Sequence, residues 1–262
     1  MGNLYPKKHT MKQIPFGILT AWVVTITNCF LPIAGAADPA GVRSSAPVRL
    51  ALIGDSTVCD YNSTSAKRGW GQLLPEFLPK GTQITNLARG GASTKTFPPD
   101  RWQRVLASRP DYVLIQFGHN DSHAKDKPES TDAATDYRDN LCRYVREARD
   151  AGIKPVLVTP VRRRLYKNGH PTTELARYAD AMKAVTTGLG VSLIDLHATS
   201  GELFDRLGED GSEAFTVNKP DNADRPGLGD RTHFTETGAR EVARLVAAGL
   251  AGIEPRLAVT SR

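Results

Sequence analysis

Cysteine is scarce in this sequence, and the spacing of its cysteines matches no zinc-binding pattern. The 262 residues include 3 cysteines. Cys29 lies in an apolar N-terminal segment, which leaves Cys59 and Cys142 in the rest of the chain. In an exported protein these two could form a disulfide, whereas Cys142, on a predicted helix, could simply be a small buried hydrophobic side chain. The sequence leaves both possibilities open.

Motifs typical of nucleic-acid-binding proteins are also missing. The formal net charge is +6 and the sequence pI is about 9.3, a balance that can indicate an anionic partner. Apart from Arg162, Arg163 and Arg164 the basic residues are scattered, and no RNA-binding aromatic motif accompanies them. We therefore expect a soluble basic surface without a nucleic-acid partner, and an acidic polysaccharide remains a possible partner.

The first 37 residues have the composition of an export signal. Lysines give a positively charged start, an apolar run follows from Ile14 to Phe30, and Ala34-Gly35-Ala36 offers a cleavage point. The alternative is an uncleaved membrane anchor, because the apolar run is long enough for one. We predict a signal peptide over 1–37, a linker over 38–47 and one domain over 48–262. The protein is then secreted or periplasmic and has no stable membrane association after cleavage.

Short apolar segments alternate with segments of helical periodicity, and there is neither an internal repeat nor a second domain. The predicted strands are 48–53, 84–86, 112–117, 155–159 and 191–194. The predicted helices are 73–78, 100–107, 132–151, 174–187, 201–207 and 235–250. This alternation favours right-handed crossovers and a sheet covered on both faces. We predict an α/β fold, a three-layer flavodoxin-like sandwich with a mostly parallel five-stranded sheet.

The first predicted strand ends at a serine. Gly54 breaks the apolar run, and Asp55, Ser56 and Thr57 follow where the strand must turn into a loop. Chemistry in α/β sheets gathers at the carboxyl ends of the strands, so Ser56 is a candidate nucleophile. Taken alone, such a sequence is also typical of an ordinary turn, in which Asp55 bonds to the backbone.

The ends of the next two predicted strands carry Gly91 and Asn120. Because the carboxyl ends of parallel strands lie along one edge, both residues can approach Ser56. A serine that attacks an ester needs hydrogen-bond donors for the developing oxyanion. The backbone N–H groups of Ser56 and Gly91 and the side-chain amide of Asn120 could supply them. The alternatives are a tight turn at Gly91 and an Asx turn at Asn120.

The segment Asp230-Arg231-Thr232-His233 precedes the last predicted helix and supplies a base with an orienting carboxylate. One turn of chain can present both side chains on the same side. Asp230 could then hold one ring nitrogen of His233 while the other faces Ser56. Alternatively, His233 is a capping or surface histidine. We expect His119 to be a core residue or to support the site from behind.

Together these motifs resemble the SGNH, or GDSL-like, esterase family, and within it the rhamnogalacturonan acetylesterase branch. The matching segments are Gly54-Asp55-Ser56-Thr57, Gly69-Trp70-Gly71, 86–93, Phe117-Gly118-His119-Asn120-Asp121, Thr159-Pro160 and 230–234. They follow the family's order and span nearly all of the chain after the leader. Thr57 stands where lipase-like members have leucine, which favours the carbohydrate branch. The resemblance also selects Gly91 rather than the adjacent Gly90.

The resemblance implies a catalytic triad of Ser56, His233 and Asp230, and an oxyanion hole formed by Ser56, Gly91 and Asn120. It further implies secretion and the deacetylation of a carbohydrate without a metal or an organic cofactor. We predict a monomeric serine esterase that acts on O-acetylated plant cell-wall polysaccharide or oligosaccharide, with pectic rhamnogalacturonan as the expected substrate.

Two further residues are candidate substrate contacts. Trp70 could stack on a sugar ring, or it could be a core or rim aromatic residue. Arg162 follows the fourth predicted strand and could meet galacturonate carboxylates, or it could lie on a solvated loop. The polar segment 208–229 matches no motif, and we expect it to help shape the substrate groove.

The sequence leaves two other functions open. The hydrolase could act on xylan, another acetylated glycan or a short-chain lipid ester. The protein could also be a catalytically silent carbohydrate-binding relative. The presence of Ser56, Asp230, His233 and Asn120 together argues against a silent site.

Overall fold

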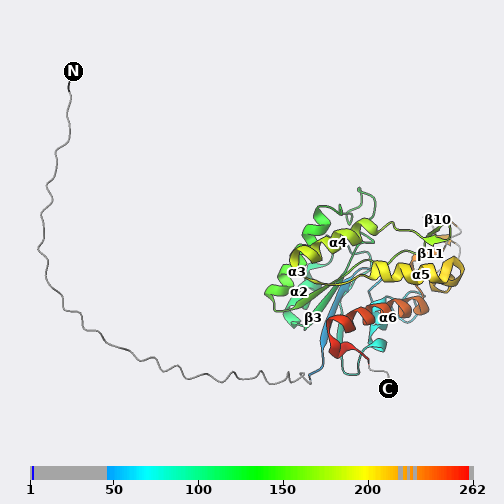
Figure 1. Ribbon diagram of the computed structural model, residues 1–262, viewed down its shortest axis with the longest axis horizontal. Helices are drawn as coiled ribbons and strands as arrows, with labels where there is room; N and C mark the ends of the chain where they lie inside the picture. Colours follow the sequence, from blue (N-terminus) through cyan, green and yellow to red (C-terminus); the bar gives the residue numbers. More distant parts are fainter. Residues whose placement is uncertain (1, 3–45, 218–220, 223–224, 227–228, 260–262) are drawn as a thin grey trace, which may run out of the picture. The chain divides into compact units, whose positions relative to one another are not determined.

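The structure is a computed structural model that describes residues 2, 46–217, 221–222, 225–226 and 229–259 (Figure 1). The predicted export signal, apart from residue 2, and the predicted linker as far as residue 45 lie outside the described residues. The predictions for these two segments therefore remain predictions.

A five-stranded sheet forms the centre of the domain, in the order β2-β1-β3-β4-β7. Its strands are β1 (Arg49–Gly54), β2 (Gln83–Asn86), β3 (Tyr112–Gln116), β4 (Lys154–Val158) and β7 (Ser192–Ile194). Every neighbouring pair in this sheet is parallel. The predicted α/β class and the predicted set of sheet strands are confirmed.

The strand sequences fit a sheet that is buried on both faces. Every residue of β3 is buried, as expected where helices cover both sides of a parallel sheet. Alternate residues of β1 point into different cores: Leu50 and Leu52 pack into one hydrophobic cluster, and Ala51 and Ile53 into the other. The period of two along a strand therefore supplies both cores from the same segment.

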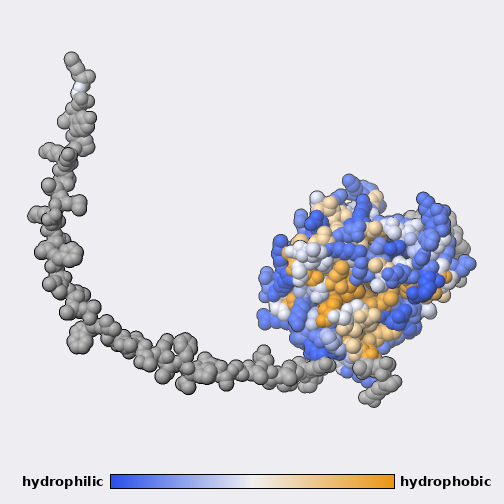
Figure 2. All heavy atoms as spheres, viewed as in Figure 1, coloured by the Kyte–Doolittle hydropathy of each residue, from blue (hydrophilic) through white to orange (hydrophobic). Residues whose placement is uncertain are grey.

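Helices cover both faces of the sheet (Figure 1). One face carries α2 (Pro99–Ser108), α3 (Asp136–Asp150) and α4 (Ala176–Leu189). The other carries α1 (Trp70–Leu73), α5 (Leu196–Ser212) and α6 (Glu236–Ile253). Figure 2 shows hydrophilic side chains around much of the visible face and an apolar area between α4 and α6. Among the helices described here, none is both long and apolar enough to cross a membrane.

The two cysteines of the domain lie on opposite sides of the sheet. Cys59 is buried in the cluster beneath α1 and α6, and Cys142, on α3, packs against the other cluster. Both thiols are free. Because the sheet separates them, the disulfide that the sequence left open does not form, and Cys142 is a partly buried packing residue.

Several short elements were not predicted. They are β5 (Tyr166–Lys167), β6 (His170–Pro171), η2 (Glu213–Phe215), β8 (Thr216–Val217), β9 (Asp221–Asn222), β10 (Arg225–Pro226), β11 (Asp230–Phe234) and η3 (Pro255–Leu257). The predicted helix 73–78 corresponds to the last residue of α1 and the 3-10 helix η1 (Leu74–Phe77). The predicted helix 201–207 was too short, because α5 begins directly after β7 with the Asp195 side chain as its N-cap. It also continues past Gly208, whose backbone is non-helical (φ 69°, ψ 179°). Segment 208–229 is therefore not simply a loop.

We expect Leu114→Ala in the central strand β3 to lower the free energy of unfolding by about 2–5 kcal/mol. Leu114 is fully buried, so the substitution leaves a cavity in the core. The matched control is Leu207→Ala on α5, where the side chain is 36% exposed and we expect a change of about 0.5 kcal/mol or less. Urea unfolding measures both, and equal losses at the two positions would contradict the described core.

Candidate active site

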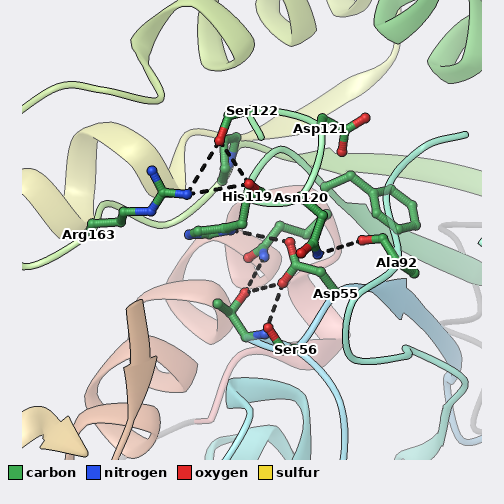
Figure 3. Close-up of polar contacts among 12 residues, drawn as sticks. Asp55, Ser56, Ala92, His119, Asn120, Asp121, Ser122 and Arg163 are labelled. Carbon is green, nitrogen blue, oxygen red and sulfur yellow. Dashed lines mark hydrogen bonds and ion pairs between the residues drawn. The ribbon is translucent and has the colours of Figure 1, made fainter. Parts of the chain in front are cut away.

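The carboxyl ends of the central strands bring three predicted site residues to one edge of the sheet. Ser56 follows β1 and Asn120 follows β3 (Figure 3), and these two strands are parallel neighbours. Gly91 follows β2, which pairs with β1 on its other side. The structure therefore places Ser56, Gly91 and Asn120 on the edge where the sequence predicted them.

His233 reaches Ser56 from a distant part of the sequence. Its Nε2 lies 2.9 Å from Oγ of Ser56, and its Nδ1 lies 2.7 Å from Oδ2 of Asp230. With the Nδ1 proton donated to the carboxylate, Nε2 is left as the acceptor for the Ser56 hydroxyl. The arrangement can therefore take a proton from the serine and stabilise the imidazolium that results.

The Asp55 carboxylate shapes the turn that presents Ser56. One of its oxygens accepts hydrogen bonds from the backbone N–H and the hydroxyl of Thr57, at 2.9 and 2.7 Å. The other lies 3.2 Å from Nδ1 of the buried His119. Burial alone would raise the pKa of Asp55, but the charge and hydrogen bonds of His119 and Thr57 hold it below its ordinary value. The predicted structural role of Asp55 and the buried position of His119 are both observed.

A buried series of hydrogen bonds continues from this turn into the core. The Thr57 hydroxyl accepts from the side-chain amide of Gln116, 2.6 Å away, and Gln116 Oε1 accepts from Trp70 Nε1 at 2.8 Å. Trp70 is fully buried, so the prediction that it stacks on a sugar ring is wrong. Its indole belongs to the core and ties β3 to the Ser56 turn.

The glycines on either side of Trp70 explain why this tryptophan lies so deep. A Cβ at Gly69 would come within 2.2 Å of the carbonyl oxygen of Cys59, and one at Gly71 within 2.5 Å of that of Val58. Only glycine allows α1 to pack this closely against the chain that follows Ser56. The Gly69-Trp70-Gly71 motif is therefore a packing motif that supports the nucleophile.

Asp230 and His233 lie on β11, not on the turn of chain that was predicted. β11 pairs antiparallel with β8, and the register shifts between Asp230 and Phe234. In a regular strand, residues three apart point to opposite faces. The irregular register, together with hydrogen bonds from the backbone N–H groups of Thr232 and His233 to Asp230 Oδ1, brings both side chains to the same side.

The surroundings of Asp230 keep its carboxyl ionised. Burial alone would raise its pKa, but hydrogen bonds from the side chain and backbone of His233, and the charge of that ring, hold the pKa well below its ordinary value. The ammonium of Lys67 also lies 3.4 Å from Asp230 Oδ2. Lys67 was not predicted as a site residue, because it belongs to a polar loop without a motif.

The backbone N–H groups of Ser56 and Gly91 are available for an oxyanion. Neither donates to any acceptor in the part of the chain that the structure describes. Gly91 has a φ of +78°, a backbone conformation that favours glycine. The reason is the backbone conformation and not a lack of space, because a Cβ there would meet nothing within 4 Å. A Cβ at Gly90 would lie 3.7 Å from that of Ser56, so this turn passes directly beside the serine.

Asn120 is oriented by one of its two side-chain N–H groups. Nδ2 donates to the carbonyl oxygen of Ala92 at 2.8 Å (Figure 3), which leaves the second N–H free to donate elsewhere. The neighbouring Asp121 accepts from the backbone and hydroxyl of Thr94 and from the hydroxyl of Thr131, and burial raises its pKa to about 6. These bonds connect the loop after β2 to the loop after β3. They therefore also hold Gly91, on the first loop, in a fixed position relative to Asn120, on the second.

The three consecutive arginines after β4 reach different places. Arg162 donates from Nε to the carbonyl oxygen of His197 on α5. In the described part of the chain it forms no hydrogen bond with the other predicted site residues. Arg163 donates to the carbonyl oxygen of His119 and to Ser122 Oγ, both at 3.3 Å (Figure 3). Arg164 is buried beside β11. The structure therefore brings Arg163, not Arg162, to the edge that carries Asn120.

Side chains suited to a metal are not clustered in the described ranges: no group of three or more His, Cys, Asp or Glu residues there could hold an ion. The carboxylates of Asp55 and Asp230, on either side of Ser56, are bonded to histidine and to hydroxyl or backbone donors. One signal in the sequence could have revealed this network, namely Gln116, the single strongly polar residue in the buried strand β3.

The sequence matches the GDSL-like lipase/acylhydrolase family over residues 52–241. This range includes Ser56, Gly91, Asn120, Asp230 and His233. It also contains all five strands of the sheet except the start of β1.

Two curated relatives from Bacillus subtilis (strain 168) are similar over most of their length. The rhamnogalacturonan acetylesterase RhgT is 39% identical over 217 residues, which are 78% of this chain and 90% of the relative. The probable rhamnogalacturonan acetylesterase YesY is 39% identical over 203 residues, 76% of this chain and 90% of the relative.

Solved structures have the same fold. The crystal structure of YxiM from Bacillus subtilis superposes with a TM-score of 0.68 at 25% identity over 79% of this chain, and the match spans only 57% of that protein. A mutant of Axe2, an acetyl-xylooligosaccharide esterase from Geobacillus, superposes with a TM-score of 0.61 at 20% identity, covering 83% of this chain and 98% of that one.

We expect Asp230→Asn to remove a contribution to stability that depends on pH. The ordinary pKa of an Asp carboxyl is 3.8, and that of Asp230 is lower in the folded state. The folded protein therefore binds fewer protons than the unfolded chain, so the ionised carboxylate stabilises the fold above this ordinary value and the contribution disappears as the pH falls through the folded pKa.

Urea unfolding between about pH 5 and pH 2 tests this. The parent should exceed the variant by on the order of 2 kcal/mol at about pH 5, and the difference should shrink towards pH 2. Asp126→Asn, at an exposed position, is the control and should show no such trend. A difference for Asp230→Asn that is the same at every pH would contradict the assignment.

Proposed function

Because the chain belongs to the GDSL-like lipase/acylhydrolase family and is a serine carboxylic-ester hydrolase, we propose that it is a carbohydrate acetylesterase acting on acetylated rhamnogalacturonan. The observation that carries the proposal is the 2.9 Å contact between Ser56 Oγ and His233 Nε2. The hydrogen bond between His233 and Asp230 completes the Ser–His–Asp triad. The assigned roles are Ser56 as nucleophile, His233 as base and Asp230 as orienting carboxylate.

The first half of the reaction transfers the acetyl group to the enzyme. Ser56 Oγ attacks the acetyl carbonyl carbon while His233 Nε2 takes the hydroxyl proton. The carbonyl oxygen becomes an oxyanion, which accepts hydrogen bonds from Ser56, Gly91 and Asn120. When the tetrahedral species collapses, the sugar oxygen leaves and takes the proton from His233, so Ser56 carries an acetyl ester.

The second half restores the serine. Water attacks the acetyl carbonyl carbon and gives a proton to His233, and the same donors stabilise the second oxyanion. The bond between that carbon and Ser56 Oγ then breaks, His233 returns the proton to Oγ, and acetate leaves. General-base assistance of this kind contributes about 10²–10⁴ in rate, and each oxyanion donor about 3–4 kcal/mol of barrier.

Two observations support a pectic substrate. Of the two Bacillus subtilis relatives at 39% identity, RhgT is named rhamnogalacturonan acetylesterase and YesY probable rhamnogalacturonan acetylesterase. The chain also has a basic balance. Its net charge is +6, and +3 remains without the three charges of Lys7, Lys8 and Lys12 in the proposed export signal, which suits a polysaccharide that bears uronate carboxylates. Acetylated xylan is the alternative to be tested: the Geobacillus esterase shares the fold, and likeness at 20% identity is evidence of fold alone.

The proposed site is tested by Ser56→Ala. The parent should hydrolyse p-nitrophenyl acetate, and the variant should lose at least about 10³-fold in kcat. The matched control is Ser108→Ala at the end of α2, where the hydroxyl bonds to the Val105 carbonyl oxygen and no change in kcat is expected. An inactive parent, or a fully active Ser56→Ala, would remove the hydrolytic mechanism.

The substrate is tested separately by acetate release from a panel. We expect faster release from acetylated rhamnogalacturonan than from acetylated xylan, and little activity on p-nitrophenyl octanoate. Equal or faster release from xylan would overturn the pectic substrate but keep the esterase. A preference for the octanoate would point to lipids, and glycan binding without acetate release would favour a silent binding protein.

We also propose that residues 1–37 are a cleaved export signal and that the mature protein is a secreted or periplasmic monomer. The support is the composition of this segment, with a basic start, an apolar run and small residues at 34–36. Expression in a bacterial host, with N-terminal sequencing of the exported protein and its molar mass by light scattering, tests both parts. Protein retained in the membrane with Met1 intact would contradict cleavage, and a dimeric mass would contradict the monomer.

A further inference from the structure

Arg164 is a fully buried cation whose contacts are with the strand that carries His233. Its side chain has no exposed surface. One nitrogen, Nη2, donates to two carbonyl oxygens, that of Asp230 at 3.0 Å and that of His233 at 2.5 Å. The guanidinium carbon also lies 4.4 Å from the centre of the Phe234 ring. Every one of these contacts is with β11.

The backbone of Arg164 is joined to the same strand. Its N–H donates to the carbonyl oxygen of Arg231 at 2.9 Å. Within the residues described, the other guanidinium nitrogens, Nε and Nη1, have no hydrogen-bond partner. The polar contacts of this residue are thus directed at the segment from Asp230 to His233, in which the register of β11 shifts.

Burial of a guanidinium is unfavourable unless nearby groups compensate it. Burial lowers the pKa of Arg164 to about 9, and the nearby charge of Asp230 acts in the opposite direction. The group therefore stays protonated at neutral pH. A charged side chain in this position is more costly than an apolar one of the same size, so its contacts with β11 point to a role beyond packing.

The two accepting carbonyls belong to the two residues that must point the same way. A regular strand would turn Asp230 and His233 to opposite faces, and the irregular register prevents this. A single nitrogen that bonds to both carbonyl oxygens sets the distance between them. A lysine ammonium lacks the planar fork and the stacking surface that the guanidinium offers Phe234.

We propose that Arg164 is a positioning residue, which holds the Asp230–His233 segment in its irregular register, called the bulge below, so that the imidazole points at Ser56. The proposal rests on the proposed function of this site. Arg164 itself contacts neither the nucleophile nor the oxyanion donors in the structure. Its effect on the reaction passes through the backbone of β11.

The test compares Arg164→Met, Arg164→Lys and Arg164→Gly with Arg149→Met. Arg149 is a matched control, because its Nη2 also donates to two carbonyl oxygens, those of Leu189 and Gly190, both at 2.9 Å. That site is at the C-terminal end of α4, just before β7 begins, whereas Ser56 follows the carboxyl end of β1. We expect kcat on p-nitrophenyl acetate to fall about 10²-fold in Arg164→Met, with a smaller change in KM, and to stay at the parent value in Arg149→Met.

Three readouts separate positioning from simple loss of stability. Ethylguanidinium should restore part of the kcat of Arg164→Gly in a saturable way, because it can occupy the vacated site. The downfield proton resonance of the His233 Nδ1–H, donated to Asp230, should be present in the parent and shifted or lost in Arg164→Met. Arg164→Lys should keep the fold, as judged by its melting temperature, and still lose kcat.

Full kcat per folded molecule in Arg164→Met or Arg164→Lys would overturn the proposal. So would a loss of kcat that matches the loss of folded protein and that ethylguanidinium does not restore. If Arg164→Met and Arg164→Gly fail to fold, the lysine variant alone decides. An inactive parent would contradict the proposed esterase function instead, and the proton resonance would still report whether Arg164 orients His233.

Discussion

The hydrogen bond between Ser56 Oγ and His233 Nε2 joins residues 177 positions apart in the sequence, and the rest of the site depends on it. Each of the two side chains is held in position by a different part of the fold. Ser56 is fixed by the sheet, because β1 lies between β2 and β3 and ends in the Asp55 turn. His233 lies on β11, which pairs with β8 outside the central sheet. A bridge between Arg68 and Phe234 ties that strand to the loop after Ser56.

The polar network beneath Ser56 explains how this partly buried serine is held in position. Trp70, Gln116, Thr57, Asp55 and His119 form one buried series of hydrogen bonds. In a low-dielectric interior such groups are costly when unpaired and strongly orienting when paired. In this series the donors and acceptors between the indole and the Asp55 carboxylate satisfy one another. The network therefore links the core of the domain to the orientation of the nucleophile.

The sheet and the strand-end residues could be predicted because burial on both faces leaves continuous apolar runs, as in β3. Local sequence could not show that Trp70 is buried, since the cause is the approach of Gly69 to the distant carbonyl oxygen of Cys59. The bulge in β11 was also missed, because it depends on pairing with β8. The arginines after β4 are consecutive in sequence, yet they diverge to α5, His119 and β11, which no local pattern specifies.

The buried contacts between Arg164 and β11 depend on the backbone geometry of this strand, and the geometry depends on the contacts. The position of the base His233 is coupled to both. The guanidinium gains its hydrogen bonds only when the carbonyl oxygens of Asp230 and His233 occupy their bulged positions. A regular strand would leave it charged and unpaired in the interior, a state that costs several kcal/mol. Conversely, the bulge loses its internal anchor if the cation is absent. Geometries in which His233 is turned only partly towards Ser56 are therefore disfavoured, because they break the hydrogen bonds of Arg164 and remove the support of the bulge. The imidazole thus has one well-defined position.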